Sequence, residues 1–201
     1  MISDSANRIF EAAIKDYHVH DEIDFPIQNP YPPERIEHLL YLKCWIDTMQ
    51  WHMEDEIRDP NINSDEALKW KRRIDKSNQD RTDTVEYIDS YFLDKYKDIT
   101  PKADATVNTE SPAWAIDRLS ILALKIYHMR LETLRDDADP EHKEACQVKL
   151  DVLIEQQKDL SESIDELLKN IEEGKKIMKV YKQMKMYNDP NLNPVLYSSK
   201  Q

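Results

Sequence analysis

Apolar residues return at spacings of three and four over most of the chain, which is the pattern of helices with one buried face. One such stripe consists of Ile74, Asn78, Arg81, Val85, Ile88 and Phe92. No Gly or Pro interrupts it. Asn78 and Arg81 therefore occupy positions where a helix normally carries leucine. The pattern predicts a helix that turns an amide and a guanidinium toward its own core.

Prolines and capping residues divide the chain into expected helices, since proline starts a helix well but cannot continue one. We expect helices at residues 5–18, 33–59, 65–96, 112–135, 140–174 and 175–187. Ser64, Ser111 and Asp139 each precede a first turn and are the expected N-caps. Gly174, the sole glycine, stands where a helix end favours positive φ.

The segments between these helices are a Pro-rich arm at residues 21–33, a loop at 98–111 and a Pro-containing C-terminal tail at 188–201. The arm is either a linker or a wrapped segment. Short connections between long helices favour antiparallel neighbours. We therefore expect an all-α fold: residues 1–201 as a single-domain antiparallel bundle of four long helices, with a shorter N-terminal helix and a short basic C-terminal helix.

Composition supports this fold class and limits the partners. One glycine in 201 residues and 34% charged residues suit a helical chain. A net charge of −12 argues against nucleic-acid binding, which requires clustered Lys and Arg. No purely apolar run exceeds four residues, so we expect neither a membrane span nor a secretion signal, and hence a cytoplasmic protein. Cys44 and Cys146 lie in apolar patterns and are expected to be buried free thiols.

Three long helices carry polar residues on stripes that should face inward. Asp117 lies on such a stripe of the fourth expected helix, and we expect it to pair with Arg81 across the bundle. Gln157 is the one polar member of the apolar seam on the fifth. Arg118 and Lys125 either extend their stems to water or join the same site. We expect Lys43 and Asp47, four residues apart, to be an ordinary pair on the outside.

The inward polar groups suit either of two functions. These groups form either a structural hydrogen-bond network or the walls of a ligand pocket. The pocket would bind a phosphorylated or otherwise anionic small molecule, because guanidinium groups match such anions. Its expected ligand-binding residues are Asn78, Arg81, Arg118, Lys125 and Gln157. His52, Asp55 and Asp117 are the candidates for general acid or base.

No cofactor is evident, although carboxylates would allow Mg²⁺. The candidate Mg²⁺ ligands are Glu54, Asp55, Glu86 and Asp89. Solvated acids on helix faces are the usual explanation of such pairs in a chain with 40 acidic residues. We expect no histidine-based transition-metal site, because the di-iron motif Glu-x-x-His and the spacing of zinc ligands are both absent.

The segment from 175 to 187 contains five lysines and no acid, in contrast to the acidic remainder. The alternative function is therefore a non-enzymatic interaction or structural protein. Its basic C-terminal helix would contact a protein partner or a second copy of the chain, with the inward polar residues as a structural network. The simpler alternative is that this helix docks on the acidic body of its own chain.

Four stretches carry a resemblance to a known family: "WHMEDEIRDP", "IDKSNQDRTDTVEYID", "SPAWAIDRLSILALKIYH" and "KQMKMYNDPNLNPVLY". They resemble the bacterial proteins grouped as domain of unknown function 4254, over about residues 36–197. The resemblance implies a single all-helical domain with an ordered C-terminal tail. It implies no activity, so no catalytic residue is carried over from it.

Overall fold

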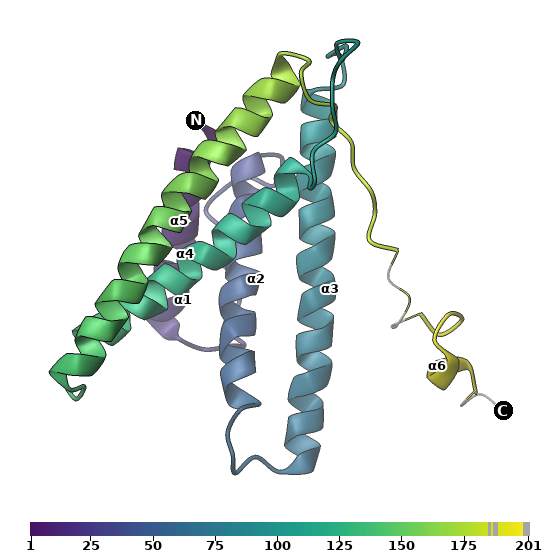
Figure 1. The fold of residues 1–201 in the computed structure, drawn as a ribbon. Coiled ribbons are helices and arrows are strands. Elements are labelled where there is room, and N and C mark those ends of the chain that lie inside the picture. The colour runs from purple at the N-terminus through teal and green to yellow at the C-terminus, as the bar shows by residue number, and fades with distance from the viewer. Residues whose placement is uncertain (185, 187–188, 199–201) are drawn as a thin grey trace.

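The computed structural model describes residues 1–184, 186 and 189–198 and is all-α, as predicted (Figure 1). Its helices are α1 Ile2–His20, α2 Ile36–Glu56, α3 Ser64–Lys95, α4 Pro112–Leu134, α5 Pro140–Glu172 and α6 Pro194–Ser198. Within the described part of the chain, the one β contact is an isolated bridge between Thr106 and Lys176. None of the described helices combines the length and apolar character needed to cross a membrane.

The ends of the long helices follow the predicted capping residues closely. Ser111 accepts a hydrogen bond from the Trp114 amide at 3.4 Å, and Asp139 accepts one from the His142 amide at 2.8 Å. The N-cap of α3 is Asn63, one residue before the predicted Ser64. α2 begins at Ile36, three residues after the predicted start, because residues 32–35 form a turn first.

Two antiparallel helix pairs form the bundle. α2 and α3 lie side by side, and α4 and α5 form a second pair that crosses them at an incline (Figure 1). α1 packs against α2, α4 and α5. α4 contacts α1, α2, α3 and α5 and is therefore the central helix, as its apolar character predicts.

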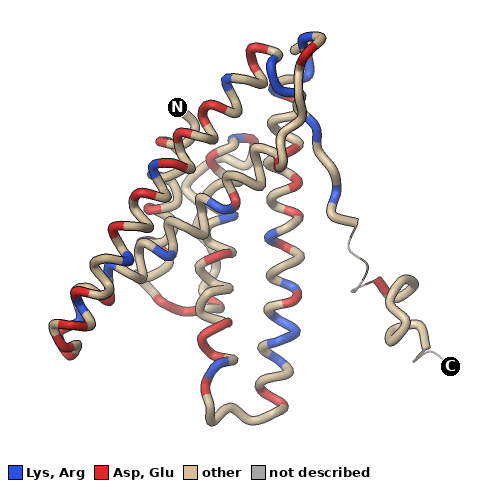
Figure 2. The backbone as a smooth tube through the Cα atoms, in the orientation of Figure 1, with Lys and Arg blue, Asp and Glu red and all other residues tan. Residues whose placement is uncertain are grey.

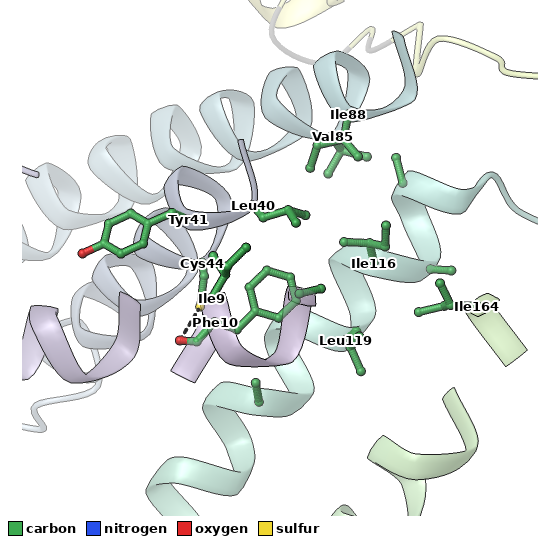
Figure 3. Close-up of a cluster of buried hydrophobic side chains, with 14 of the residues drawn as sticks. Ile9, Phe10, Leu40, Tyr41, Cys44, Val85, Ile88, Ile116, Leu119 and Ile164 are labelled. Atoms are coloured by element: carbon green, nitrogen blue, oxygen red, sulfur yellow. Dashed lines mark hydrogen bonds between the residues drawn. The ribbon is translucent and has the colours of Figure 1, made fainter. Parts of the chain in front are cut away.

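The core is a continuous apolar cluster to which all five long helices contribute (Figure 3). Phe10, Leu40, Ile88 and Ile116 are among its fully buried members. Cys44 lies in the same cluster and donates a hydrogen bond to the carbonyl of Phe10. Burial raises the pKa of the Cys44 thiol to about 12, and both cysteines are free and buried, which confirms the expectation of buried free thiols.

The Pro-rich arm between α1 and α2 is a wrapped segment. Phe25, Ile27 and Tyr31 are partly buried against the core. His38 fixes the end of the arm through its contact with the Tyr31 carbonyl at 2.8 Å. The arm therefore contributes apolar surface to the bundle and is not a simple linker.

The prediction of a basic helix at residues 175–187 is wrong for residues 175–184, which are extended or irregular. Here the amide of Thr106 donates to the carbonyl of Lys175 at 3.2 Å, and the amide of Ile177 donates to the carbonyl of Thr106 at 3.0 Å. Lysines three or four residues apart repel each other on a helix, which opposes helix formation in this segment. Lys185 and Tyr187 lie outside the described residues.

Candidate functional site

Arg81 and Asp117 form the predicted ion pair across the α3–α4 interface. The Nε atom of Arg81 donates to Oδ1 of Asp117 at 3.0 Å, and its Nη2 atom donates to Oδ2 at 2.6 Å. The Arg81 side chain keeps 25% of its surface exposed, whereas that of Asp117 keeps 3%. Such a two-point contact is the strongest arrangement for these two groups.

Lys43 and Asp47 extend this pair into a buried ionic cluster of two cations and two carboxylates. The ammonium group of Lys43 is fully buried, contacts Asp47 and lies 3.0 Å from Oδ1 of Asp117. Ser120 donates a hydrogen bond to Asp47 at 2.6 Å. The prediction that Lys43 and Asp47 form an exposed pair is therefore wrong. The signal was present in the sequence, since Lys43 and Asp47 lie within the largely apolar stretch from Leu39 to Met49.

The two carboxylates of this cluster differ in acidity. Burial raises the pKa of Asp47 above its ordinary value, although Lys43 opposes the shift. Burial also acts to raise the pKa of Asp117, but Lys43 and Arg81 outweigh it and hold the pKa below the ordinary value. An Asp117 carboxylate that is held charged between two cations is a poor general base at neutral pH.

A cavity of about 410 Å³ opens beside this cluster, between α2, α3 and α4. Asp47 and Arg81 belong both to the ionic cluster and to the cavity wall. The full lining is Asp47, Gln50, Trp51, Glu54, Asp55, Arg58, Arg81, Ile121 and Leu124. Acidic residues follow the C-terminal half of α2, whereas Lys and Arg gather on the N-terminal half of α3 (Figure 2). The cavity therefore lies where charges of both signs face each other.

The other predicted ligand-binding residues do not all reach this cavity. Asn78 accepts a hydrogen bond at 3.1 Å from Gln50, a residue of the lining, and so lies next to it. Gln157 instead donates to Asn7 at 3.1 Å, at the interface between α1 and α5. Arg118 is exposed and pairs with Glu110 at 2.9 Å. Lys125 is exposed and lines, with Arg118, a second groove between α4 and α5 that shares only Ile121 with this cavity.

The carboxylates predicted to hold Mg²⁺ lie in different places. Glu54 pairs with Arg58 at 2.6 Å, and Asp55 is an exposed part of the cavity wall. Asp89 is buried and accepts a hydrogen bond from Ser111 at 2.9 Å, at the N-terminus of α4. Glu86 is half-buried one turn away from Asp89 on α3. The structure does not bring these two acidic pairs together.

His52, a predicted acid or base, faces away from the ionic cluster and toward other histidines. Its Nε2 atom lies 3.2 Å from Nε2 of His18. One ring nitrogen from each of His18, His52 and His128 lies within 4.8 Å of the other two. The i,i+4 partner of His128 on its own helix, Glu132, turns instead to His142 and Arg135. His18 was not among the site residues predicted from the sequence.

A sequence signal for this histidine cluster does exist. Each of the three histidines directly follows an aromatic residue, in the pairs Tyr17-His18, Trp51-His52 and Tyr127-His128, and the other three histidines of the chain do not. This dipeptide pattern, and not the spacing along any one helix, distinguishes the histidines that converge.

Comparison with known proteins gives one family. The family model described as "Protein of unknown function (DUF4254)" matches residues 37–180, which is more than half of the chain. No curated protein and no solved structure gives a significant match. The matched range contains α3, α4 and α5 whole and all of α2 except its first residue, so the chain belongs to the DUF4254 family of proteins of unknown function.

Proposed function

We propose that the cavity beside Arg81 binds a small organic molecule with one anionic group and a flat apolar part. The observation that carries this proposal is that Arg81 belongs both to the ionic cluster and to the wall of the cavity. Its Nε and Nη2 atoms hold Asp117, while its Nη1 atom makes no hydrogen bond with any described residue. An arginine that is fixed by a buried carboxylate presents its remaining N–H donors in a defined direction, at little entropic cost on binding.

The size and the apolar wall of the cavity fit such a molecule. Small-molecule sites are typically about 300–1,000 Å³ in volume, with mostly apolar walls and a few polar groups. The volume of about 410 Å³ falls in this range. Trp51, Ile121 and Leu124 supply apolar surface, and one face of the Trp51 indole is stacked on His128, which fixes the ring in the cavity wall.

The charges of the lining favour a singly charged ligand. Asp47, Glu54 and Asp55 line the same cavity as Arg58 and Arg81, so carboxylates surround the cationic groups. A phosphate dianion would meet repulsion from these acids, whereas a carboxylate brings half that charge. A planar organic carboxylate is therefore the ligand class that we favour among the anions expected from the sequence.

The test is thermal unfolding in the presence of matched compounds. The panel consists of planar aromatic carboxylates, the corresponding aryl phosphates and the corresponding neutral amides. A ligand at one hundred times its dissociation constant stabilises the native state by about 2.7 kcal/mol. We expect the unfolding temperature to rise with a carboxylate, less with its phosphate and not with its amide.

Three variants locate the binding. Ile121→Trp fills the cavity without removing a charge, and it should abolish the shift. Arg81→Lys keeps the charge but loses the planar fork, and it should weaken the shift. Lys125→Met is the matched control, since it removes a cation from the groove between α4 and α5, which shares only Ile121 with the cavity, and it should leave the shift unchanged. If no carboxylate stabilises the wild type, or if Ile121→Trp retains the shift, the cavity is not the binding site.

A second candidate function rests on the exposed side chains that follow α5. Tyr181 and Met184 are exposed, and four lysines accompany them among the described residues between 175 and 182. We infer that this segment contacts the acidic helices of a second copy of the chain. Sedimentation at low and high salt tests this, with Lys179→Gln and Lys182→Gln as variants. Self-association that is weakened by salt and by both variants supports it, and a monomer in every condition contradicts it.

A further inference from the structure

We propose that His18, His52 and His128 form a binding site for a divalent first-row transition metal, with Zn²⁺ as the ion that fits best. The three side chains come from α1, α2 and α4. One ring nitrogen of each lies within 4.8 Å of the other two. The centroids of the three rings are 5.2, 5.5 and 5.7 Å apart, which is nearly an equilateral triangle. This proposal is independent of the ligand of the Arg81 cavity.

The distance between His18 and His52 already matches a metal site. Zn²⁺ binds imidazole nitrogen at about 2.0–2.1 Å, so two nitrogens on a tetrahedral ion lie about 3.3 Å apart. The two Nε2 atoms of His18 and His52 are 3.2 Å apart. The ring nitrogen of His128 lies within 4.8 Å of these two, so a bound ion would draw it closer to them.

Hydrogen bonding leaves the required lone pair on His18. Its Nδ1 atom lies 2.7 Å from the carbonyl oxygen of Ile14. A carbonyl only accepts, so Nδ1 carries the proton and Nε2 of the neutral ring has a free lone pair. Metal-binding histidines usually donate their other N–H to a carbonyl or carboxylate in this way.

His128 presents a buried nitrogen that nothing else in the described chain uses. Its Nε2 atom is shielded from solvent and has no hydrogen-bond partner among the residues that the structure describes. Burial lowers the pKa of His128 to about 4, and His18 and His52 add to the shift. The ring is therefore neutral at physiological pH, which is the form that binds a metal. A buried polar atom without a partner is costly unless a ligand satisfies it.

Aromatic rings hold the three imidazoles in place. Tyr127 covers His18 at 4.5 Å, Trp51 stacks on His128 at 4.6 Å, and Tyr17 stacks on His52 at 5.2 Å between ring centroids. Each of these aromatic residues precedes a different histidine of the cluster in the sequence. The three aromatic–histidine pairs therefore lock one another in a closed cycle that restricts ring rotation, as a preorganised site requires.

One acidic group lies at the edge of the cluster. Asp21 ends α1 in the left-handed conformation, with φ of 53°, and its Oδ1 atom lies 3.7 Å from Nε2 of His52. A carboxylate here balances part of the charge that Zn²⁺ brings. Three histidine ligands leave one position of a tetrahedral ion for this carboxylate or for water, as in zinc sites that are open to a substrate.

The competing explanation is a hydrogen bond between the two Nε2 atoms, with the proton on His52. Metal binding requires the other neutral tautomer of His52, in which that proton lies on Nδ1 and Nε2 has the lone pair. A direct titration separates the two explanations. Protein stripped of metal by a chelator is titrated with ZnCl₂ by calorimetry and with CoCl₂ by visible absorption, because tetrahedral Co²⁺ absorbs strongly.

Glutamine variants identify the ligands. We expect one Zn²⁺ per chain. Mutation of a residue that only hydrogen-bonds a metal ligand already lowers metal affinity by about 10–100-fold. We therefore expect a loss of Zn²⁺ affinity of at least about tenfold in each of the variants His18→Gln, His52→Gln and His128→Gln. His20→Gln is the matched control on the same helix. His142→Gln is the second control, because His142 lies in another group with Glu132 and Cys146.

A measurement on the wild type removes any dependence on the folding of these variants. Imidazole ¹⁵N spectra with and without Zn²⁺ should show large shifts for His18, His52 and His128, and none for His20 and His38. The proposal is overturned if Zn²⁺ does not bind, if it binds without moving the three ring signals, or if His142→Gln abolishes binding while the cluster variants retain it.

Discussion

The guanidinium of Arg81 and the carboxylate of Asp117 face each other in a two-point contact between α3 and α4, at 2.6 and 3.0 Å. The contact continues to Lys43, which is fully buried and shared between Asp117 and Asp47. The four charges balance, so removal of one cation leaves an excess of buried negative charge. Such an excess is costly because the low-dielectric interior does not solvate it.

We therefore predict that Lys43→Met lowers the free energy of unfolding by about 3–5 kcal/mol, the usual result of breaking a buried ion pair. Arg81→Met should cost less, about 1–3 kcal/mol, because Asp117 keeps Lys43 and water reaches the site. Urea unfolding monitored by circular dichroism measures both. The control Lys125→Met removes an exposed cation and should change stability by no more than about 0.5 kcal/mol. Equal losses in all three variants would contradict the structural role of the cluster.

The pH dependence of the cluster gives a second prediction. The pKa of Asp47 is raised above 3.8 by burial, and that of Asp117 is held below 3.8 by Lys43 and Arg81. As the pH falls from neutral, Asp47 should therefore take up its proton before Asp117. Carboxyl ¹³C signals of the two residues measure this order. Titration of both groups together at the ordinary pH of aspartate would contradict it.

The sign of the stability change follows from the same shifts. The folded protein binds a proton at Asp117 less readily than the unfolded chain does, so this group stabilises the fold above pH 3.8. That contribution disappears as the pH falls through the folded pKa. Asp47 acts in the opposite direction, because its raised pKa makes the charged form unfavourable at neutral pH. Asp117→Asn should thus lower the free energy of unfolding at neutral pH. The difference from the wild type should shrink as the pH falls.

Local features of the sequence predicted the helices well. The caps at Ser111 and Asp139 and the helix end near Gly174 depend on side chains within a few residues. The pairing of Arg81 with Asp117 was also predictable, because two opposite charges on buried stripes must satisfy each other. The basic segment after Gly174 was mispredicted because its apolar spacing suits a helix, whereas its observed contacts are with the distant residue Thr106.

Contacts that depend on how helices rotate about their axes were not predictable. Periodicity places Gln157 on the inner face of α5 but does not say whether that face meets α1 or α3, and it meets Asn7 of α1. Arg118 lies one position from Asp117, and that step turns it to solvent. The histidine cluster draws one residue from each of three helices, so no spacing within a helix could reveal it.

The C-terminal tail provides a third prediction. α6 packs against none of the other helices, and none of the described residues from 189 to 198 is buried (Figure 1). Deleting residues 188–201 should therefore change the free energy of unfolding of the bundle by no more than about 0.5 kcal/mol, as for other surface changes. Thermal and urea unfolding of the two chains measure the difference. A clear loss of stability on deletion would show that the tail belongs to the core.

The turn after α5 gives the last prediction. Gly174 has φ of +70°, and a Cβ atom there would lie 2.9 Å from the backbone carbonyl oxygen of Thr100. The left-handed conformation alone costs an L-residue about 1–2 kcal/mol, and the contact with the Thr100 backbone adds to it. The carbonyl of Gly174 also accepts a hydrogen bond from the amide of Lys102 at 2.9 Å, which ties the turn to the loop after α3.

Gly174→Ala should therefore lower the free energy of unfolding by at least about 1 kcal/mol, measured by urea unfolding. Glu173→Ala, one residue earlier with φ of −80°, is the matched control and should shift it by no more than about 0.5 kcal/mol. Similar midpoints for Gly174→Ala and the wild type would mean that the turn relaxes without strain.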